Sequence, residues 1–134
     1  ASTRERQDGV WRDRPWSQRH ALHGGFTWRT GRWSLSARAS WRSGWSTTPR
    51  VDAPESLGRA LYSERLPHFL SLDVHLARRF AVPRGSLELY LDLANATFHD
   101  NVGGYVYSGG PGAFEREPRE LLHAVPVLGL SYTW

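Results

Sequence analysis

The sequence predicts an all-β fold, an antiparallel meander of about five strands. Three observations lead to this fold class. Apolar and polar residues alternate with a period of two in five segments, tight turns containing Gly or Pro join two pairs of these segments, and no useful length of chain shows the helical period of about 3.6 residues. Because a strand with a period of two has one apolar and one polar face, we expect a sheet with the same asymmetry.

The first two predicted strands form a hairpin. Residues 18–29 place apolar side chains, among them Phe26 and Trp28, at even positions and mainly polar ones at odd positions. Residues 33–41 place Trp, Leu or Ala at every odd position and Ser or Arg at every even one. Thr30-Gly31 is the expected tight turn between them, because Gly accepts the backbone conformations that such turns need.

The third and fourth predicted strands form a second hairpin. Residues 70–80 have apolar even positions, with Arg78 as the one breach near the end. Residues 87–94 have Leu at each odd position. Residues 81–85 contain Pro and Gly and are the expected turn.

The fifth predicted strand is the C-terminal run, residues 125–134. Every even position from Leu128 onward is apolar or aromatic, and the run ends on Tyr132 and Trp134. Aromatic rings at a chain terminus are favourable where they are withdrawn from bulk water, and a membrane interface provides such an environment. Pro126 departs from a regular strand and is best tolerated at an edge or a bulge.

The connections between the strands alternate in length. The two turns are short, whereas residues 43–65 and 99–118 form long links rich in Gly, Ser, Thr and Pro. Short turns on one side and long loops on the other are typical of a transmembrane β-barrel. Residues 33–41 extend about 26 Å, or about 20 Å along the membrane normal after tilting, close to an apolar band of about 25 Å.

The aromatic side chains gather near the two ends of the predicted strands, as interfacial anchoring requires. We therefore expect the C-terminal part of a transmembrane β-barrel, with apolar side chains facing lipid, short turns and C-terminus in the periplasm, and an N-terminal stretch that belongs to another outer loop. The short-turn group is Trp28, Trp33, Phe80, Tyr132 and Trp134, and the loop-side group is Trp16, Trp41, Trp45 and Phe98.

Composition excludes several other classes. The chain has no Cys, so it has neither a disulfide nor a thiolate metal site, and it has no apolar run long enough for a membrane helix or a signal peptide. Arg supplies all 17 basic residues, which we interpret as codon bias. The polar opening and the absence of Met indicate a processed or truncated piece of a longer protein.

No catalytic, cofactor or metal site is expected. Glu88 and Asp92 share a face but lie about 13 Å apart along a strand, beyond a glycosidase pair, so we interpret them as solvated carboxylates facing the lumen. His20 and His23 fall on opposite faces of the first strand, and His68 and His75 also differ in parity, so neither pair can chelate one metal.

Two further motifs have plain interpretations. Asn95-Ala96-Thr97 matches a glycosylation sequon, which is common by chance and irrelevant at a strand end in a bacterial envelope. Residues 103–112 are rich in Gly but lack the strand-then-helix context of a phosphate loop, so we expect a flexible outer loop.

Two alternatives compete with the membrane interpretation. A soluble β-sandwich binding module also alternates, but its Trp residues would not gather at strand ends. A nucleic-acid surface could combine Arg with Trp, but in residues 32–42 these residues point to opposite faces, so no nucleic acid partner is expected.

The chain resembles the C-terminal end of TonB-dependent outer-membrane receptors, from about Trp11 to Trp134. The order and spacing of several strings carry this resemblance. They are RPWSQRH at 14–20, the strand pair through Trp45, LPHFLSLDV at 66–74, LYLDLANA at 89–96 and PVLGLSYTW at 126–134.

The resemblance implies a barrel of about 22 strands with a plugged lumen, of which this chain supplies the last five, without the plug domain. It implies uptake of a scarce nutrient such as an iron chelate (siderophore) or cobalamin across the outer membrane of a Gram-negative bacterium, with no enzymatic activity and no cofactor. The expected partners are outer-membrane lipid, the barrel-insertion machinery, the remaining strands and plug, and TonB through that plug. Another outer-membrane barrel, a porin or barrel enzyme, remains the alternative.

Two sets of functional residues follow. The interfacial aromatics are Trp28, Trp33, Trp41 and Phe80, and the terminal assembly signal implied by the resemblance is Leu128, Leu130, Tyr132 and Trp134.

Overall fold

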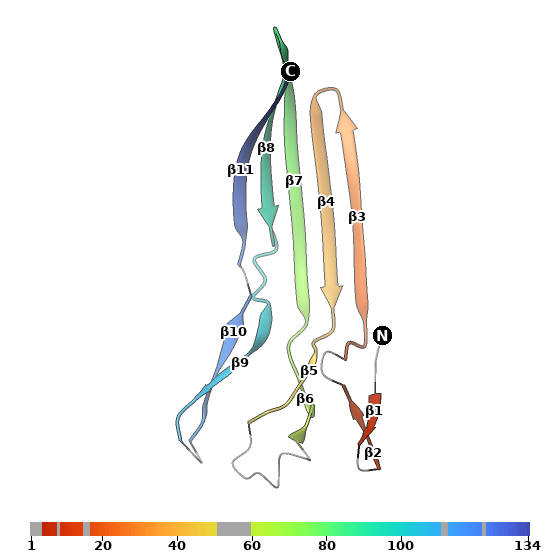
Figure 1. The fold of residues 1–134 in the computed structure, drawn as a ribbon, viewed down its shortest axis with the longest axis vertical. Coiled ribbons are helices and arrows are strands. Elements are labelled where there is room, and N and C mark those ends of the chain that lie inside the picture. Colours follow the sequence, from red (N-terminus) through yellow and green to blue (C-terminus); the bar gives the residue numbers. More distant parts are fainter. Residues whose placement is uncertain (1–3, 8, 15–16, 51–59, 111–112, 122) are drawn as a thin grey trace. The chain divides into compact units, whose positions relative to one another are not determined.

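A computed structural model describes residues 4–7, 9–14, 17–50, 60–110, 113–121 and 123–134, and every element with described bounds is a β-strand (Figure 1). The chain divides into two compact units. We call them the sheet unit, His23–Ser40, Leu70–His99 and Leu122–Trp134, and the loop unit, Ala1–Leu22, Trp41–Phe69 and Asp100–Leu121.

The sheet unit contains the five strands that the alternation predicts, apart from one end of β3, β4 and β7. Their spatial order is β11-β8-β7-β4-β3, so each long strand pairs with the next one along the chain, and Figure 1 shows neighbouring arrows running in opposite directions. The predicted all-β antiparallel meander is confirmed. The sheet is open, with β3 and β11 as its edges. The bounds are β3 Ala21–Thr30, β4 Trp33–Arg42, β7 Phe69–Val82, β8 Gly85–Ala94 and β11 Val125–Thr133.

Strand register aligns the alternation of neighbouring strands. Leu91 of β8 lies opposite Leu76 of β7 and Leu128 of β11, and the other apolar positions of these strands follow in the same rows. Because a slip of one residue would turn a strand's apolar set to the other face, this register gives the sheet one apolar face and one polar face.

The two short turns lie close to where the sequence predicts them. The β3–β4 turn is Gly31-Arg32, and the β7–β8 turn is Pro83-Arg84. Gly31 has a φ of 54°, a left-handed conformation in which Gly has no steric penalty. The first turn lies one residue later than expected, because β3 extends to Thr30, and the second is shorter than expected, because β7 extends to Val82 and β8 begins at Gly85.

The predicted start of the first strand is wrong by three residues. The strand begins at Ala21, because residues 17–20 are held by local contacts of the loop unit instead. The hydroxyl of Ser43 accepts hydrogen bonds from the N–H groups of Arg19 and His20, each at 3.1 Å. His20 therefore precedes β3, whereas His23 lies on it.

The loop unit contains three short hairpins. They are β1 Arg4–Gln7 with β2 Val10–Asp13, β5 Ser46–Thr47 with β6 Glu64–Arg65, and β9 Val102–Ser108 with β10 Glu115–Glu120. Residues 15–16, including Trp16, and residues 51–59 and 111–112 of the two long links lie outside the described residues.

The expectation of a flexible loop over residues 103–112 is wrong in its described part. Residues 102–108 form β9, which pairs with β10 so that Tyr105 lies opposite Pro118. Tyr and Val have high strand propensity, and this outweighs the neighbouring glycines. Pro118 is tolerated because a two-stranded hairpin has a free edge on each strand.

A single layer of sheet buries little apolar surface. Among the described residues, only Leu66 and Ala77 are buried apolar side chains. Domains normally stabilise a sheet by covering its apolar face with a second layer. Among the described residues of the sheet unit, no second layer covers the long strands.

Candidate functional site

The apolar face of the sheet is exposed over all five strands. Leu89 and Leu91 are each 42% exposed, and Leu128 is 72% exposed. A continuous apolar surface of this kind marks an interaction site with apolar matter, because water solvates it poorly. Its exposed members also include Leu22, Phe26, Trp28, Trp33, Trp41, Leu76, Leu130 and Tyr132.

The predicted interfacial aromatics lie at the ends of the sheet. Trp28, Trp33 and Phe80 are close to the two short turns, and Trp41 is next to the last residue of β4 at the opposite end. Phe98 follows β8 in the sheet unit, whereas Trp45 belongs to the loop unit. Rings at both ends of an apolar surface are the arrangement that membrane interfaces favour.

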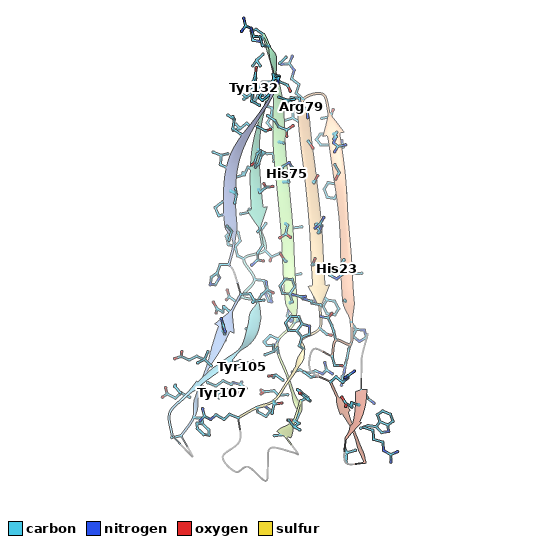
Figure 2. The ribbon with its side chains drawn as sticks, viewed as in Figure 1. His23, His75, Arg79, Tyr105, Tyr107 and Tyr132 are labelled. Carbon is cyan, nitrogen blue, oxygen red and sulfur yellow. The ribbon has the colours of Figure 1, made fainter. Side chains whose placement is uncertain are left out.

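The four residues of the predicted assembly signal lie on or just beyond the edge strand β11. All four are exposed, with Trp134 reaching 92%. The Tyr132 hydroxyl donates a hydrogen bond to the Arg84 carbonyl at 2.9 Å, and its ring lies 6.2 Å from that of Trp134. This contact ties the end of β11 to the β7–β8 turn. Figure 2 labels Tyr132 near the end of β11. Recognition by the insertion machinery stays a prediction.

The polar face carries ordered cross-strand pairs. Nδ1 of His75 lies 2.5 Å from the Asp92 carboxylate, and Arg79 donates to Glu88 at 3.0 Å. His75 and Arg79 both lie on β7 (Figure 2). Glu88 and Asp92 share a face, as predicted. The interpretation of both as solvated carboxylates is incomplete, because each has a partner on the neighbouring strand β7. Only the register of β7 against β8 could have revealed these partners.

Hydroxyl groups continue the polar face over β3 and β4. Thr27 and Ser36 lie 3.0 Å apart through their hydroxyl oxygens, and Nδ1 of His23 lies 3.1 Å from the Ser40 hydroxyl. Two open hollows of about 670 and 720 Å³ lie along this face. Polar side chains from four strands line them, among them Arg29, Arg32, Arg38 and His75. Such a surface suits water or a polar neighbour.

Comparisons of the chain with protein-family models, curated proteins and solved structures give no match. Within the described residues, no helix is long and apolar enough to cross a membrane. The interpretation of the chain therefore depends on the geometry of the sheet and on its sequence pattern.

The sequon residue Asn95 has a structural role at the end of β8. It is 5% exposed and has a φ of 51°. Its amide nitrogen donates to the His99 carbonyl at 3.0 Å, and its amide oxygen accepts from the Thr97 hydroxyl at 2.7 Å. Local hydrogen bonds of a short polar side chain stabilise the left-handed backbone conformation. Asn95 therefore forms a corner where the chain leaves the sheet.

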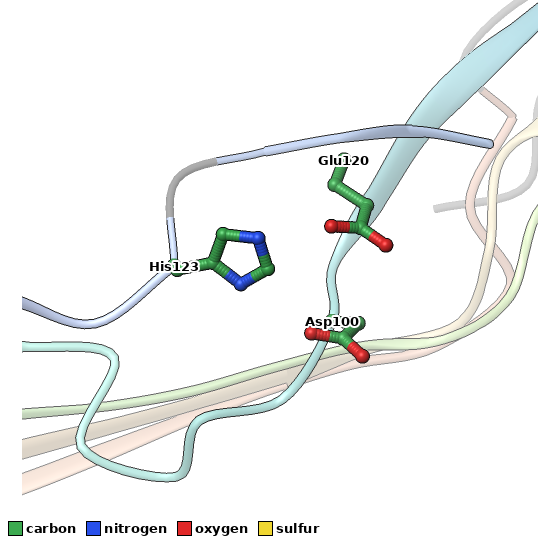
Figure 3. A group of neighbouring side chains, drawn as sticks. All are labelled: Asp100, Glu120 and His123. Atoms are coloured by element: carbon green, nitrogen blue, oxygen red, sulfur yellow. The ribbon is translucent and has the colours of Figure 1, made fainter.

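Each of the two histidine pairs considered from the sequence is divided between the two units. His20 and His23 fall in different units, and so do His68 and His75. Figure 3 draws Asp100 and Glu120 of the loop unit with His123 of the sheet unit; all three are exposed, and no motif in the sequence predicts them. Exposed acidic groups are common without an ion, and no metal site is assigned to them.

One ion pair joins two segments of the loop unit. Arg116 of β10 donates to the Glu64 carboxylate, and its guanidinium carbon lies 4.3 Å from the centre of the Tyr105 ring. The hydrogen bond and the negative charge of Glu64 raise the pKa of Arg116 above its ordinary value. The pair links the two long connections through residues 64 and 116.

Proposed function

We propose that this chain is the C-terminal strand segment of a TonB-dependent outer-membrane transporter, which takes up a scarce nutrient such as an iron chelate or cobalamin. One observation carries the membrane part of the proposal. The five-stranded sheet exposes a continuous apolar face with aromatic rings at its ends and a charged, hydroxyl-rich face on the other side. In a transmembrane β-barrel these faces meet lipid and the lumen.

The open edges of the sheet support the same proposal. Lipid offers no hydrogen bonds, so every backbone N–H and C=O of a spanning strand needs a partner in another strand. β3 and β11 each have one unpaired edge. These edges are where we expect the remaining strands of the barrel to pair, with the plug and the lumen on the polar side.

The transport class comes from the family resemblance alone. It predicts that TonB acts through the plug and that the barrel-insertion machinery reads the terminal residues, including Tyr132 and Trp134. Cells that lack this chain should lose uptake of one labelled iron chelate or of cobalamin. Normal uptake of every such compound, with the protein still in the outer membrane, would favour another outer-membrane barrel such as a porin or a barrel enzyme.

Cysteine accessibility in isolated outer membranes tests the orientation of the two faces. Residues 1–134 contain no Cys, so each variant carries a single thiol within this chain, and any Cys in the rest of the protein is first replaced by Ser. We would place one Cys at each position from 87 to 92 of β8 and treat the membranes with a water-soluble maleimide. We expect labelling at 88, 90 and 92, and protection at 87, 89 and 91 until detergent is added, because lipid excludes the reagent.

A control and two contrary outcomes make this test decisive. Val106 of β9 is 55% exposed, so Val106→Cys should react before and after detergent. Equal labelling of odd and even positions in the membrane would contradict the proposal. Recovery of the protein in the aqueous fraction, with 87, 89 and 91 protected there as well, would instead support a soluble β-sandwich.

A further inference from the structure

Arg78 is the one charged side chain on the apolar face of the five described strands. Its neighbours at alternate positions of β7 are Leu76 and Phe80, and its cross-strand partner on β8 is Leu89. The alternation of β3, β4, β8 and β11 puts apolar side chains, Gly, Pro, Tyr and the uncharged Thr30 on the same face. A positive charge at this place needs a compensating group, because apolar surroundings do not solvate it.

Two aromatic rings hold the Arg78 guanidinium. Its central carbon lies 5.0 Å from the centre of the Trp33 ring and 4.9 Å from that of Phe80. Such cation–π contacts orient the guanidinium and attract it, but they leave the charge and the N–H donors for a further partner. Within the described residues, no carboxylate forms an ion pair with Arg78.

The position of this cluster specifies the chemistry of that partner. Trp33 is the first residue of β4, and Phe80 lies two residues before the end of β7, so the cluster sits beside the short turns. In the proposed function, this end of the apolar face meets the lipid headgroups of the periplasmic leaflet. A guanidinium binds phosphate through two parallel hydrogen bonds, and a long Arg side chain can reach the headgroup level from an apolar surface.

The surrounding charge favours an anionic lipid. Arg29, Arg32, Arg79 and Arg84 lie at the same end of the sheet, and the one side-chain carboxylate among the described residues there, Glu88, is paired with Arg79. Basic residues near a membrane surface attract anionic headgroups.

We propose that Arg78, held between Trp33 and Phe80, binds the headgroup phosphate of a phospholipid. This proposal rests on the proposed function, since it needs the apolar face to lie in a bilayer. A glycerophospholipid with net negative charge, such as phosphatidylglycerol, is the expected class of ligand. The bound phosphate neutralises the only charge on the face and holds the sheet at a defined depth.

Solid-state NMR on the membrane-extracted protein, together with the strands it assembles with, measures this contact. The protein is labelled with ¹³C at the arginine guanidinium carbons and reconstituted in phosphatidylglycerol vesicles without phosphate buffer. Dephasing of the ¹³C signal by ³¹P then reports an Arg next to a lipid phosphate. We expect dephasing in the wild type. In Arg78→Gln this dephasing should be lost, as the difference between the wild-type and variant spectra will show.

Matched variants separate a specific contact from general charge. Arg29→Gln removes the same charge at the same end of the sheet but from the polar face, and it should keep the dephasing. Arg78→Lys keeps the positive charge but replaces the guanidinium, with its observed carbon and its two parallel hydrogen bonds, by an ammonium, so it should lose the signal even if Arg78→Gln fails to assemble. Dephasing that survives in Arg78→Lys would overturn the proposal.

The source of the phosphate is tested separately. Vesicles of a phosphorus-free glycolipid with added inorganic phosphate should give no dephasing at Arg78, and an equal signal there would overturn the headgroup assignment. Failure of the proposed function has a different signature, because the protein would then be missing from the membrane fraction before any NMR is done.

Discussion

The carboxylate of Asp73, on β7, accepts a hydrogen bond from the backbone N–H of Asn95, 22 residues later in the chain, at 3.0 Å. The same oxygen accepts from the Ser71 hydroxyl at 2.9 Å. Asn95 follows the last residue of β8 and has a positive φ, so its N–H has left the regular strand ladder. Asp73 thus replaces a ladder partner at the point where the chain turns away from the sheet.

Removing this acceptor should weaken the corner after β8. Asp73→Ala leaves a buried backbone N–H without a partner, and we expect a loss of about 1–3 kcal/mol in the free energy of unfolding. Asp73→Asn keeps an oxygen acceptor and should lose less than half of that. Urea unfolding of the membrane-extracted protein, followed by tryptophan fluorescence, measures both. Equal effects of the two variants would show that the carboxylate charge matters more than the hydrogen bond.

Two glycines should differ in their tolerance of Ala. A Cβ on Gly85 would lie 2.1 Å from the backbone oxygen of Thr133, and Gly85 has a φ of 151°, so Gly85→Ala should cost about 1–3 kcal/mol. A Cβ on Gly129 would lie 2.1 Å from the Tyr90 ring, which can move. Gly129→Ala should therefore cost less, and its cost should fall further in a Tyr90→Ala background. Urea midpoints of the four variants give this ranking, and the reverse order would contradict it.

The ion pair between Arg79 and Glu88 should add little stability. Its side chains are 65% and 32% exposed, so solvent screens the attraction, and we expect a coupling of under about 1 kcal/mol. A double-mutant cycle of Arg79→Gln and Glu88→Gln measures the coupling. A clearly larger value would mean that the polar face is covered and dry in the assembled protein.

A charge on the apolar face should be far more costly than one on the polar face. Leu91 lies in the middle of its strand, opposite Leu76 and Leu128, and Leu91→Arg should cost about 2–4 kcal/mol if this row faces the bilayer centre. Val127 lies opposite Asp92 on the polar face and is 49% exposed, so Val127→Arg is the matched control with little expected effect. Similar costs in vesicles would contradict a lipid-facing apolar surface.

Much of the sheet could be predicted because strand alternation and turn chemistry are local. The face of each residue from 33 to 41 follows from its parity, and the turns follow from Gly31 and Pro83. The β9–β10 hairpin was missed because glycine-rich segments are typical of loops, whereas Tyr105 and Tyr107 favour a strand once β10 is there to pair with them. The start of β3 was missed because Ser43 competes for the backbone of residues 19 and 20.

The sequence by itself determined where the long strands lie, which side chains share a face, and that Arg78 interrupts the apolar face, because each of these depends on spacing within a few residues. The tertiary structure alone decided which residues meet across strands: His75 with Asp92, Arg79 with Glu88, Asp73 with Asn95, and Arg78 with Trp33. These contacts join residues 9 to 45 positions apart, and they depend on the register between strands, which no single segment contains.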